Sequence, residues 1–432
     1  MENKNIFTGF RDKNVPMNLF TPGTGFFETH VTWEDIENDM QRELGTSAPF
    51  GPNKSVKDLG DGKGFMSKLL LIEADWQQQD MELPKKFILK VITPSVWLKY
   101  ATEASKEKNT KNRFCDESPV SDFTDFLKKA HNAEVACYRH LMKLPEGKVC
   151  IPKIYFMQNF TKHNQLKGYI IMEYLENAEV DIMANFSPNQ VRQILHFKAV
   201  LEATSIDVPP EERSQFFEDL FQTVGRVFFS EEELRIAISS LRSMEDGRFA
   251  DKADHLEKII PDLIDNKWVD NLAEELGMER VLCHGDFYPP NTVWKHSSDG
   301  LSLTAVIDYQ CAHFGCSAVD LVQISIAFLS GKDRRAHWEE LLEDFYGYVE
   351  EEVGDRKMPY TLEKLKEAYR QFFPTGAFIF VPFIEPLLEI INKEKDEEHR
   401  KECYEMALEK LECMLDDIFH YHDRNMKIRK RL

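Results

Sequence analysis

The sequence predicts a two-lobed α+β fold, in which a small antiparallel β-sheet precedes a larger, mainly helical lobe. Three observations indicate this fold. Short apolar runs separated by turn-forming residues fill the first part of the chain, as paired strands require. After residue 180 the pattern becomes mostly helical, with apolar residues three and four apart. A strand-rich island at residues 281–308 interrupts this helical part.

Length and charge limit the possible classes of protein. The chain has 432 residues, which is enough for about two or three compact units. Acidic residues outnumber Lys and Arg by 74 to 54, and the formal net charge is −20. This charge argues against nucleic-acid binding and against docking on anionic membranes. We expect a globular protein that acts as a monomer or a weak dimer.

The sequence shows no pattern that is typical of a targeting signal or a membrane span. The first residues lead into no apolar segment of the secretory kind. The best candidate for a membrane span, residues 376–391, is broken by Pro382, Glu385 and Pro386. The eight cysteines form no C-x-x-C pair, which is typical of reduced, buried thiols. The sequence therefore predicts a cytoplasmic protein without membrane insertion.

Three regions follow one another along the chain. We expect residues 1–50 to form an irregular extension that packs on the small lobe, residues 51–175 to form the sheet lobe, and residues 176–432 to form the helical lobe. Within the sheet lobe, strands are predicted at 67–74, 86–93 and 168–175, and a long helix at 121–144.

The strongest local signal is an Asp followed five residues later by an Asn, at Asp286 and Asn291. This is the spacing of a phosphoryl-transfer loop, where the Asp accepts the proton of the attacking hydroxyl and the Asn binds a metal ion. Residues 292–307 then follow a hairpin pattern, which would return Asp308 beside Asn291 as a second oxygen ligand for a hard cation. The alternative is that Asp286 and Asn291 only stabilise a tight turn. Asp308, at the end of an apolar strand, favours the catalytic interpretation.

The second signal is a lysine and a glutamate in apolar surroundings. Lys90 lies on the same strand face as Ile88 and Ile92, and Glu134 lies in the middle of an apolar helical stripe. A buried carboxylate needs a cation, and Lys90 would be that partner, placed to hold the α- and β-phosphates of a nucleotide. The alternative for Lys90 is an edge-strand lysine whose stem lies along the sheet.

A glycine-rich segment precedes Lys90. Gly60, Gly62 and Gly64 alternate, and Ser67 follows them. Glycines let the backbone approach phosphate groups and present its amides to them, so we assign these four residues to nucleotide binding. The spacing differs from G-x-G-x-x-G, and an ordinary hairpin turn is the alternative.

The strand at 168–175 ends where the two lobes would join. Adenine could hydrogen-bond to the backbone of residues 172–175 at this point. We therefore add Glu173 and Leu175 to the predicted nucleotide-binding residues, although the residue types themselves carry little information.

Together these motifs resemble a known family. The resemblance is to the choline-kinase and aminoglycoside-phosphotransferase branch of the protein-kinase-like fold, and within it most closely to the ecdysteroid-kinase-like (CHK-kinase-like) family. It covers the chain from about residue 55 to the C-terminal helices. The motifs that carry it are Cys283-His284-Gly285-Asp286 with Asn291, Ile307-Asp308-Tyr309-Gln310, and Asp320-Leu321.

The resemblance implies an enzyme that uses ATP and Mg²⁺ to phosphorylate an alcohol group of a small molecule. The sheet lobe would bind the nucleotide, and the helical lobe would carry the catalytic loop and the acceptor pocket. By position, Asp286 would be the base, Asn291 and Asp308 the metal ligands, Lys90 the phosphate lysine, and Glu134 its partner.

Two further residues would support the catalytic loop. The resemblance implies that His284 braces the loop without taking part in the chemistry. Asp320 would hold the loop by accepting hydrogen bonds from its backbone or from His284. The alternative for Asp320, an N-cap of the helix that follows, is equally compatible with the sequence.

Departures from protein kinases point to a small acceptor. Gly285 stands where a protein kinase has Arg, Tyr309-Gln310 replaces Phe-Gly, and no Ala-Pro-Glu segment follows Asp308. We expect the acceptor pocket to come from helices at 180–280 and from the aromatic run 369–383. If phenylalanines of this run face the pocket, a lipophilic alcohol (steroid-like or glycosylated) fits best; otherwise they belong to the core. They are Phe372, Phe373, Phe378, Phe380 and Phe383.

Two other classes of function compete with this interpretation. A pseudokinase or scaffold would keep the fold and transfer nothing, but all the implied positions have the residue type that catalysis needs. A metal-dependent hydrolase would need more histidine ligands, and the sequence has no His-Glu-x-x-His or comparable spacing.

Overall fold

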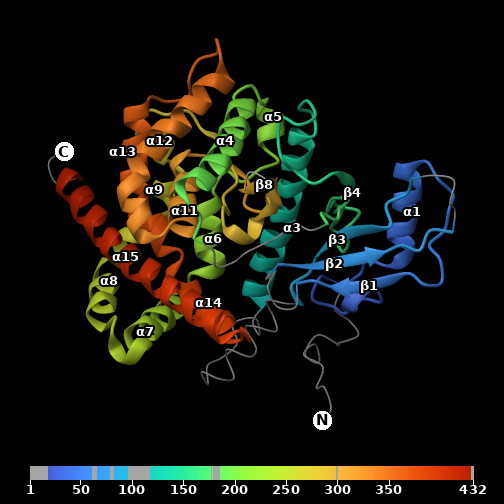
Figure 1. The fold of residues 1–432 in the computed structure, drawn as a ribbon, viewed down its shortest axis with the longest axis horizontal. Coiled ribbons are helices and arrows are strands. Elements are labelled where there is room, and N and C mark those ends of the chain that lie inside the picture. Colours follow the sequence, from blue (N-terminus) through green and yellow to red (C-terminus); the bar gives the residue numbers. More distant parts are fainter. Residues whose placement is uncertain are drawn as a thin grey trace. The chain divides into compact units, whose positions relative to one another are not determined.

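The chain folds into two compact units, which are described here separately (Figure 1). The first comprises Met1–Arg139 and Pro152–Glu176, and the second comprises His140–Ile151 and Asn177–Leu432. The structure is a computed structural model that describes residues 18–60, 66–77, 82–95, 117–176, 178, 185–297 and 300–429.

The first unit contains a five-stranded antiparallel sheet with strand order β1-β2-β3-β5-β4. The sequence predicted this small antiparallel sheet correctly but missed its two outer strands, β1 and β4. A long helix, α3 (Glu117–Leu141), lies in the chain between β3 and β4. The strands are β1 (Ser55–Asp58), β2 (Ser67–Glu73), β3 (Lys86–Ile92), β4 (Ile154–Gln158) and β5 (Tyr169–Glu173).

Strand β3 lies inside the sheet, hydrogen-bonded to β2 on one side and β5 on the other. Its register pairs Lys90 with Leu69 and with Ile170. The alternative interpretation of Lys90 as an edge-strand lysine was therefore wrong. Because side chains alternate along a strand, Lys90 points to one face of the sheet while Leu89 and Val91 point to the other.

The N-terminal segment covers the face of the sheet that carries Leu89 and Val91. This face forms one apolar cluster with residues from the segment, among them Phe26, Ile36 and Phe50. The expectation of an irregular segment was wrong for helix α1 (Trp33–Leu44), which follows a short 3₁₀ turn, η2 (Phe26–Glu28). A capping box begins α1, and the left-handed Gly45 ends it.

The second unit is mostly helical, as predicted, and holds two small sheets. Strand β6 pairs with β9, and β7 pairs with β8 as the predicted hairpin. The strands are β6 (Val281–Cys283), β7 (Thr292–Ser297), β8 (Gly300–Val306) and β9 (His313–Gly315). The helices are α4 (Pro188–Ser205), α5 (Pro210–Arg213), α6 (Leu220–Phe228), α7 (Glu231–Gly247), α8 (Ala250–Leu263), α9 (Asn266–Asp270), α10 (Leu272–Glu275), η4 (Pro289–Asn291), α11 (Ala318–Phe328), α12 (Gly331–Val353), α13 (Leu362–Phe378), η5 (Val381–Phe383), α14 (Ile384–Asn392) and α15 (Glu397–Arg429).

One stretch of the second unit, Leu362–Asn392, is long and apolar enough to cross a membrane by length and composition alone. Half of its apolar window is buried inside the protein. The stretch is also divided into α13, η5 and α14, and α13 packs on α11 and α15. Its apolar residues thus have partners within the unit, which is the behaviour of core helices.

We predict that Phe50→Ala destabilises the first unit by about 3–5 kcal/mol, because Phe50 is buried against the sheet. Its ring lies 6.1 Å from Trp33 and 4.6 Å from Trp76, so urea unfolding followed by tryptophan fluorescence reports on this cluster. Phe27→Ala is the control, because Phe27 is 44% exposed. An equal effect of the two changes would contradict the packing of this segment on the sheet.

Candidate active site

The lysine and glutamate predicted to pair do so inside the first unit. Lys90 Nζ lies 2.8 Å from both carboxylate oxygens of Glu134. The Lys90 side chain is 5% exposed and that of Glu134 is 0% exposed. The pair therefore joins β3 to α3 at a position where neither charge is fully hydrated, and each charge depends on the other.

A histidine one turn before Glu134 shares this buried environment. The Nε2–H group of His131 donates a hydrogen bond to the Gln158 carbonyl at 2.7 Å. Burial, helped by the nearby charge of Lys90, lowers the pKa of His131 to about 4 against the raising effect of the bond to Gln158. His131 is therefore neutral at physiological pH.

The remaining nucleotide-binding predictions fall near the glycine segment and at the end of β5. Gly60 lies just after β1, and its backbone N–H donates a hydrogen bond to the Asp58 carboxylate at 3.0 Å. Ser67 begins β2, opposite Ile92 of β3. Gly62 and Gly64 lie outside the described residues.

Glu173 ends strand β5, and its backbone N–H donates to the Lys153 carbonyl at 2.8 Å. The donor of Glu173 is thus already used within the sheet. Leu175 follows in the two-residue segment after the strand.

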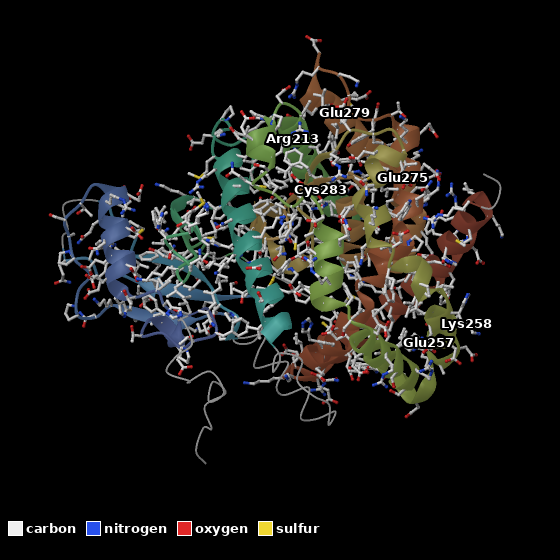
Figure 2. All side chains as sticks on the ribbon, turned by 180° about the vertical axis from the view of Figure 1, so that it is seen from behind. Arg213, Glu257, Lys258, Glu275, Glu279 and Cys283 are labelled. Carbon is white, nitrogen blue, oxygen red and sulfur yellow. The ribbon has the colours of Figure 1, made fainter. Side chains whose placement is uncertain are left out.

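The predicted catalytic loop begins where β6 ends, at the buried Cys283 labelled in Figure 2. The Asn291 amide nitrogen donates to the Asp286 carboxylate at 3.0 Å and to the Asp286 carbonyl at 2.8 Å. Asn291 and Asp286 are thus brought together, and the amide oxygen of Asn291, Oδ1, takes no part in these two bonds.

Asp308 returns beside Asn291 through the β7–β8 hairpin, as predicted. The Ile307 N–H donates to the Asn291 carbonyl at 3.0 Å, immediately before Asp308. Asp308 has a left-handed backbone with φ +65°, a conformation that costs a non-glycine residue about 1–3 kcal/mol and is common at functional sites.

The oxygen donors of Asp308 and Asn291 fit a hard divalent cation such as Mg²⁺. No cluster of three or more His, Cys, Asp or Glu side chains suited to a metal occurs among the described residues. A cation held by Asp308 and Asn291 would therefore take further ligands from phosphate oxygens and water.

His284 connects the two halves of this site. Its Nε2–H donates to the Ile307 carbonyl at 3.0 Å, and its Nδ1 accepts the N–H of Asp286 at 3.2 Å. Burial lowers the pKa of His284, so the ring is neutral and can make both bonds in one tautomer. His284 thus has the bracing position that the resemblance implied.

Asp320 holds the loop by its backbone. One carboxylate oxygen accepts the N–H of His284 at 2.9 Å and the other accepts the N–H of Gly285 at 2.8 Å. Asp320 lies in the first turn of α11, whose N-cap is Ser317. The N-cap alternative for Asp320 was wrong, and the loop-holding interpretation is the one that the contacts support.

Beneath Asp320 lies a buried network that the sequence analysis missed. Lys198 Nζ lies 2.9 Å from Asp320 and 2.5 Å from Glu202, and all three side chains are 0% exposed. Burial alone would lower the pKa of Lys198, but the two carboxylates raise it above its usual value. Glu202 also accepts hydrogen bonds from Ser317, at 2.6 Å, and from Tyr360.

Gly285 is required where the loop turns. Its φ is +80°, and a Cβ atom there would lie 2.2 Å from the Cys311 carbonyl oxygen. Gln323 fixes the same turn, since its side chain donates to the Gly285 carbonyl at 3.0 Å and accepts the Phe287 N–H at 3.1 Å. The Arg of protein kinases could not be accommodated at this position.

An aromatic pair lies beside Asp286. Tyr288, whose N–H donates to the Asp286 carbonyl at 3.1 Å, packs against Phe380 with ring centroids 4.8 Å apart. Of the five phenylalanines considered above, Phe372, Phe373 and Phe378 are buried in the core, Phe380 is half-buried, and Phe383 is 39% exposed.

Comparisons with known proteins identify the family of this chain. A protein-family model, DUF1679, described as "Uncharacterized oxidoreductase dhs-27", matches residues 19–426. The chain belongs to this family, the ecdysteroid kinase-like family. The resemblance inferred from the sequence motifs is thus confirmed.

Two curated relatives come from Caenorhabditis elegans. "Uncharacterized kinase-like protein D1044.1" is 23% identical over 61% of this chain and 67% of its own length. "Uncharacterized oxidoreductase dhs-27" is 25% identical over 77% of this chain, which spans only 40% of that relative's length.

Solved structures resemble this family member distantly. Choline kinase from Cryptosporidium parvum Iowa II is 13% identical, with 88% of this chain and 90% of that chain covered and a TM-score of 0.44. Plasmodium vivax ethanolamine kinase is 12% identical, with 90% and 91% covered and a TM-score of 0.42. The fold assignment rests on the family match and on the observed strand order, which is that of a kinase-like sheet with α3 between β3 and β4.

We predict that Gly285→Ala lowers the free energy of unfolding by roughly 3 kcal/mol, the sum of a left-handed backbone penalty and a steric clash. Gly147→Ala is the matched control, because Gly147 has φ +78° but nothing within 4 Å of an added Cβ. It should cost only about 1 kcal/mol. Urea unfolding measures both, and equal losses would contradict the steric requirement at Gly285.

We also predict a pH-dependent contribution of His131 to stability. Between pH 6.5 and pH 4 the unfolded chain binds a proton that the folded chain excludes, so stability falls as the pH falls. The wild type should lose up to roughly 3 kcal/mol relative to His131→Gln over this range, since the glutamine can donate a hydrogen bond but does not titrate. Urea unfolding at several pH values checks this, and a difference independent of pH would contradict a depressed pKa.

Proposed function

We propose that this chain is an ATP- and Mg²⁺-dependent kinase that moves the γ-phosphate to an alcohol group of a small, lipophilic molecule. The observation that carries the proposal is the fixed geometry of the catalytic loop. Asp286 is bound to Asn291, and the backbone before it is held by the buried Asp320. Membership of an ecdysteroid kinase-like family and a kinase-like relative support the same reaction class.

In the proposed mechanism, Asp286 accepts the proton of the acceptor hydroxyl as its oxygen attacks the γ-phosphorus in line. Lys90, fixed by Glu134, holds the α- and β-phosphates. Asn291 and Asp308 would hold Mg²⁺, which when bound neutralises charge on the phosphate oxygens. With a net charge of −20, the chain needs these local cations to bind a polyanionic nucleotide.

The acceptor side of the proposed site is apolar. Tyr288 and Phe380 form an aromatic surface next to Asp286, and burial together with the Asp286 charge raises the pKa of the Tyr288 phenol, which therefore stays neutral. A small depression also lies along η5, the turn that follows Phe380 in the chain. It is lined by Ala237, Ser240, Leu241, Met244, Val381, Pro382, Ile384 and Glu385. Such a lining favours a lipophilic alcohol over a polycationic sugar.

The word oxidoreductase in the family description is not carried over to this chain. It is said of a C. elegans protein of which this chain spans 40%. Asp286, Asn291 and Asp308 supply a base and oxygen ligands, which suit phosphoryl transfer and are not what hydride transfer requires.

We predict that Asp286→Asn lowers phosphate transfer by about 10³-fold or more while ATP affinity stays within about threefold, because the base acts only in the transition state. Asp251→Asn, at an exposed position of α8, is the control and should leave both quantities unchanged. The measurement uses γ-labelled ATP, Mg²⁺ and a lipophilic metabolite extract, with ATP affinity measured by calorimetry.

The same experiment separates the rival functions. Label entering an extractable small molecule with the wild type and not with Asp286→Asn supports the kinase. ATP binding without transfer to any of several extracts would favour a pseudokinase. Transfer only to polar acceptors such as choline would overturn the lipophilic acceptor while keeping the reaction.

A further inference from the structure

Two consecutive side chains attach helix α3 to the turn that joins β4 and β5. His131 donates to the Gln158 carbonyl at 2.7 Å. Asn132 makes two bonds with the backbone of Phe160, donating to its carbonyl at 3.0 Å and accepting its N–H at 3.0 Å. The Phe160 ring packs edge-on against His131, with centroids 5.4 Å apart. We call His131 and Asn132 the α3 clamp.

The turn between β4 and β5 is itself attached to β3, the strand that carries Lys90. An added Cβ on Gly168 would lie 2.2 Å from the Phe160 ring, so this ring rests directly on the Gly168 backbone. The Gly168 carbonyl accepts the N–H of Ile92 at 3.0 Å, two residues beyond Lys90 on β3.

These contacts form a closed path from α3 through the turn to β3 and back. The return link is the Lys90–Glu134 pair, with Nζ 2.8 Å from each carboxylate oxygen. The clamp and Glu134 lie within one turn of the helix, so two independent attachments fix the rotation of α3 at the position of Glu134. Apolar packing alone tolerates small rotations, whereas a two-bond contact to one backbone unit does not.

We propose that His131 and Asn132 are positioning residues that hold α3 so that the Lys90–Glu134 ion pair is in place before a nucleotide binds. The role of Lys90 in this inference rests on the proposed function. The clamp would take the place of the phosphorylation-controlled positioning of the corresponding helix in protein kinases, for which this chain has no Ala-Pro-Glu anchor.

The protonation state of His131 agrees with this role. Its second ring nitrogen, Nδ1, is buried and has no hydrogen-bond partner within the described ranges. A proton there would place an unpaired cation near Lys90, and the lowered pKa of His131, about 4, keeps the ring neutral. The clamp therefore persists over the whole physiological pH range.

A double-mutant cycle tests the inference. Asn132→Ala should weaken ATP binding about tenfold, and Glu134→Gln should weaken it by about the same factor or more. Because the clamp acts through the ion pair, the double variant should bind ATP within about twofold of Glu134→Gln alone. Asn425→Ala is the matched control, since the Asn425 side chain likewise makes two hydrogen bonds to the backbone, donating to two carbonyls at 3.1 and 3.3 Å, but within the second unit.

Additive losses in the double variant would overturn the inference, because they would mean that Asn132 acts independently of Glu134. Hydrogen exchange of the ligand-free protein gives a second, nucleotide-independent arm. Amides of α3 near residues 130–138 should exchange faster in Asn132→Ala and remain unchanged in Asn425→Ala. Unchanged exchange in Asn132→Ala would overturn the clamp. A wild type that binds no ATP would instead refute the proposed function, and the exchange arm would still decide the clamp.

Discussion

The buried carboxylate of Asp320 is the constraint on which the proposed catalytic loop depends. A charge that is 0% exposed is stable only with partners, and Asp320 has three: Lys198 and the backbone amides of His284 and Gly285. The two amides belong to the loop itself, so the electrostatic need of one side chain fixes the backbone that precedes Asp286. Burial raises the pKa of Asp320, yet Lys198 and the amide bonds lower it below its usual value, which keeps it ionised.

The first unit also contains a buried carboxylate, which is compensated by a single ion pair. Glu134 is as deeply buried as Asp320, and Lys90 is its partner. Buried ion pairs contribute little to stability, because desolvation offsets their attraction and apolar residues of similar volume often do better. Their presence at Lys90–Glu134 therefore favours a functional explanation over a stabilising one. The proposed phosphate contact of Lys90 is such an explanation, since a lysine held in place needs no reorganisation when an anion arrives.

The two-lobed fold and most of the candidate site could be predicted from the sequence, because charged residues are conspicuous in apolar surroundings. Lys90 and Glu134 were recognised in this way. The same signal exists in α4, where Lys198 and Glu202 stand four apart in a run of buried apolar residues, and it was missed because their partners are distant: Asp320 is 122 positions from Lys198, and Tyr360 is 158 from Glu202. Helix α1 was not predicted, although Thr32 and Asp35 form a capping-box pattern. Its apolar residues find their partners only on the sheet face that they cover, which is formed by distant parts of the chain.

Backbone strain in the loop also indicates preorganisation. The loop and the strand end that follow His284 contain two left-handed residues, Gly285 at φ +80° and Asp308 at φ +65°. Glycine adopts this conformation at little cost, but Asp308 does not, and its strain must be balanced by surrounding contacts. His284 supplies them, since its ring binds the Ile307 carbonyl on one side and the Asp286 amide on the other. The buried anchor of Asp320 and the ring of His284 together hold Asp286, the proposed base, and Asp308, the proposed metal ligand, in place. The backbone strain at Asp308 is thus compensated within the same network.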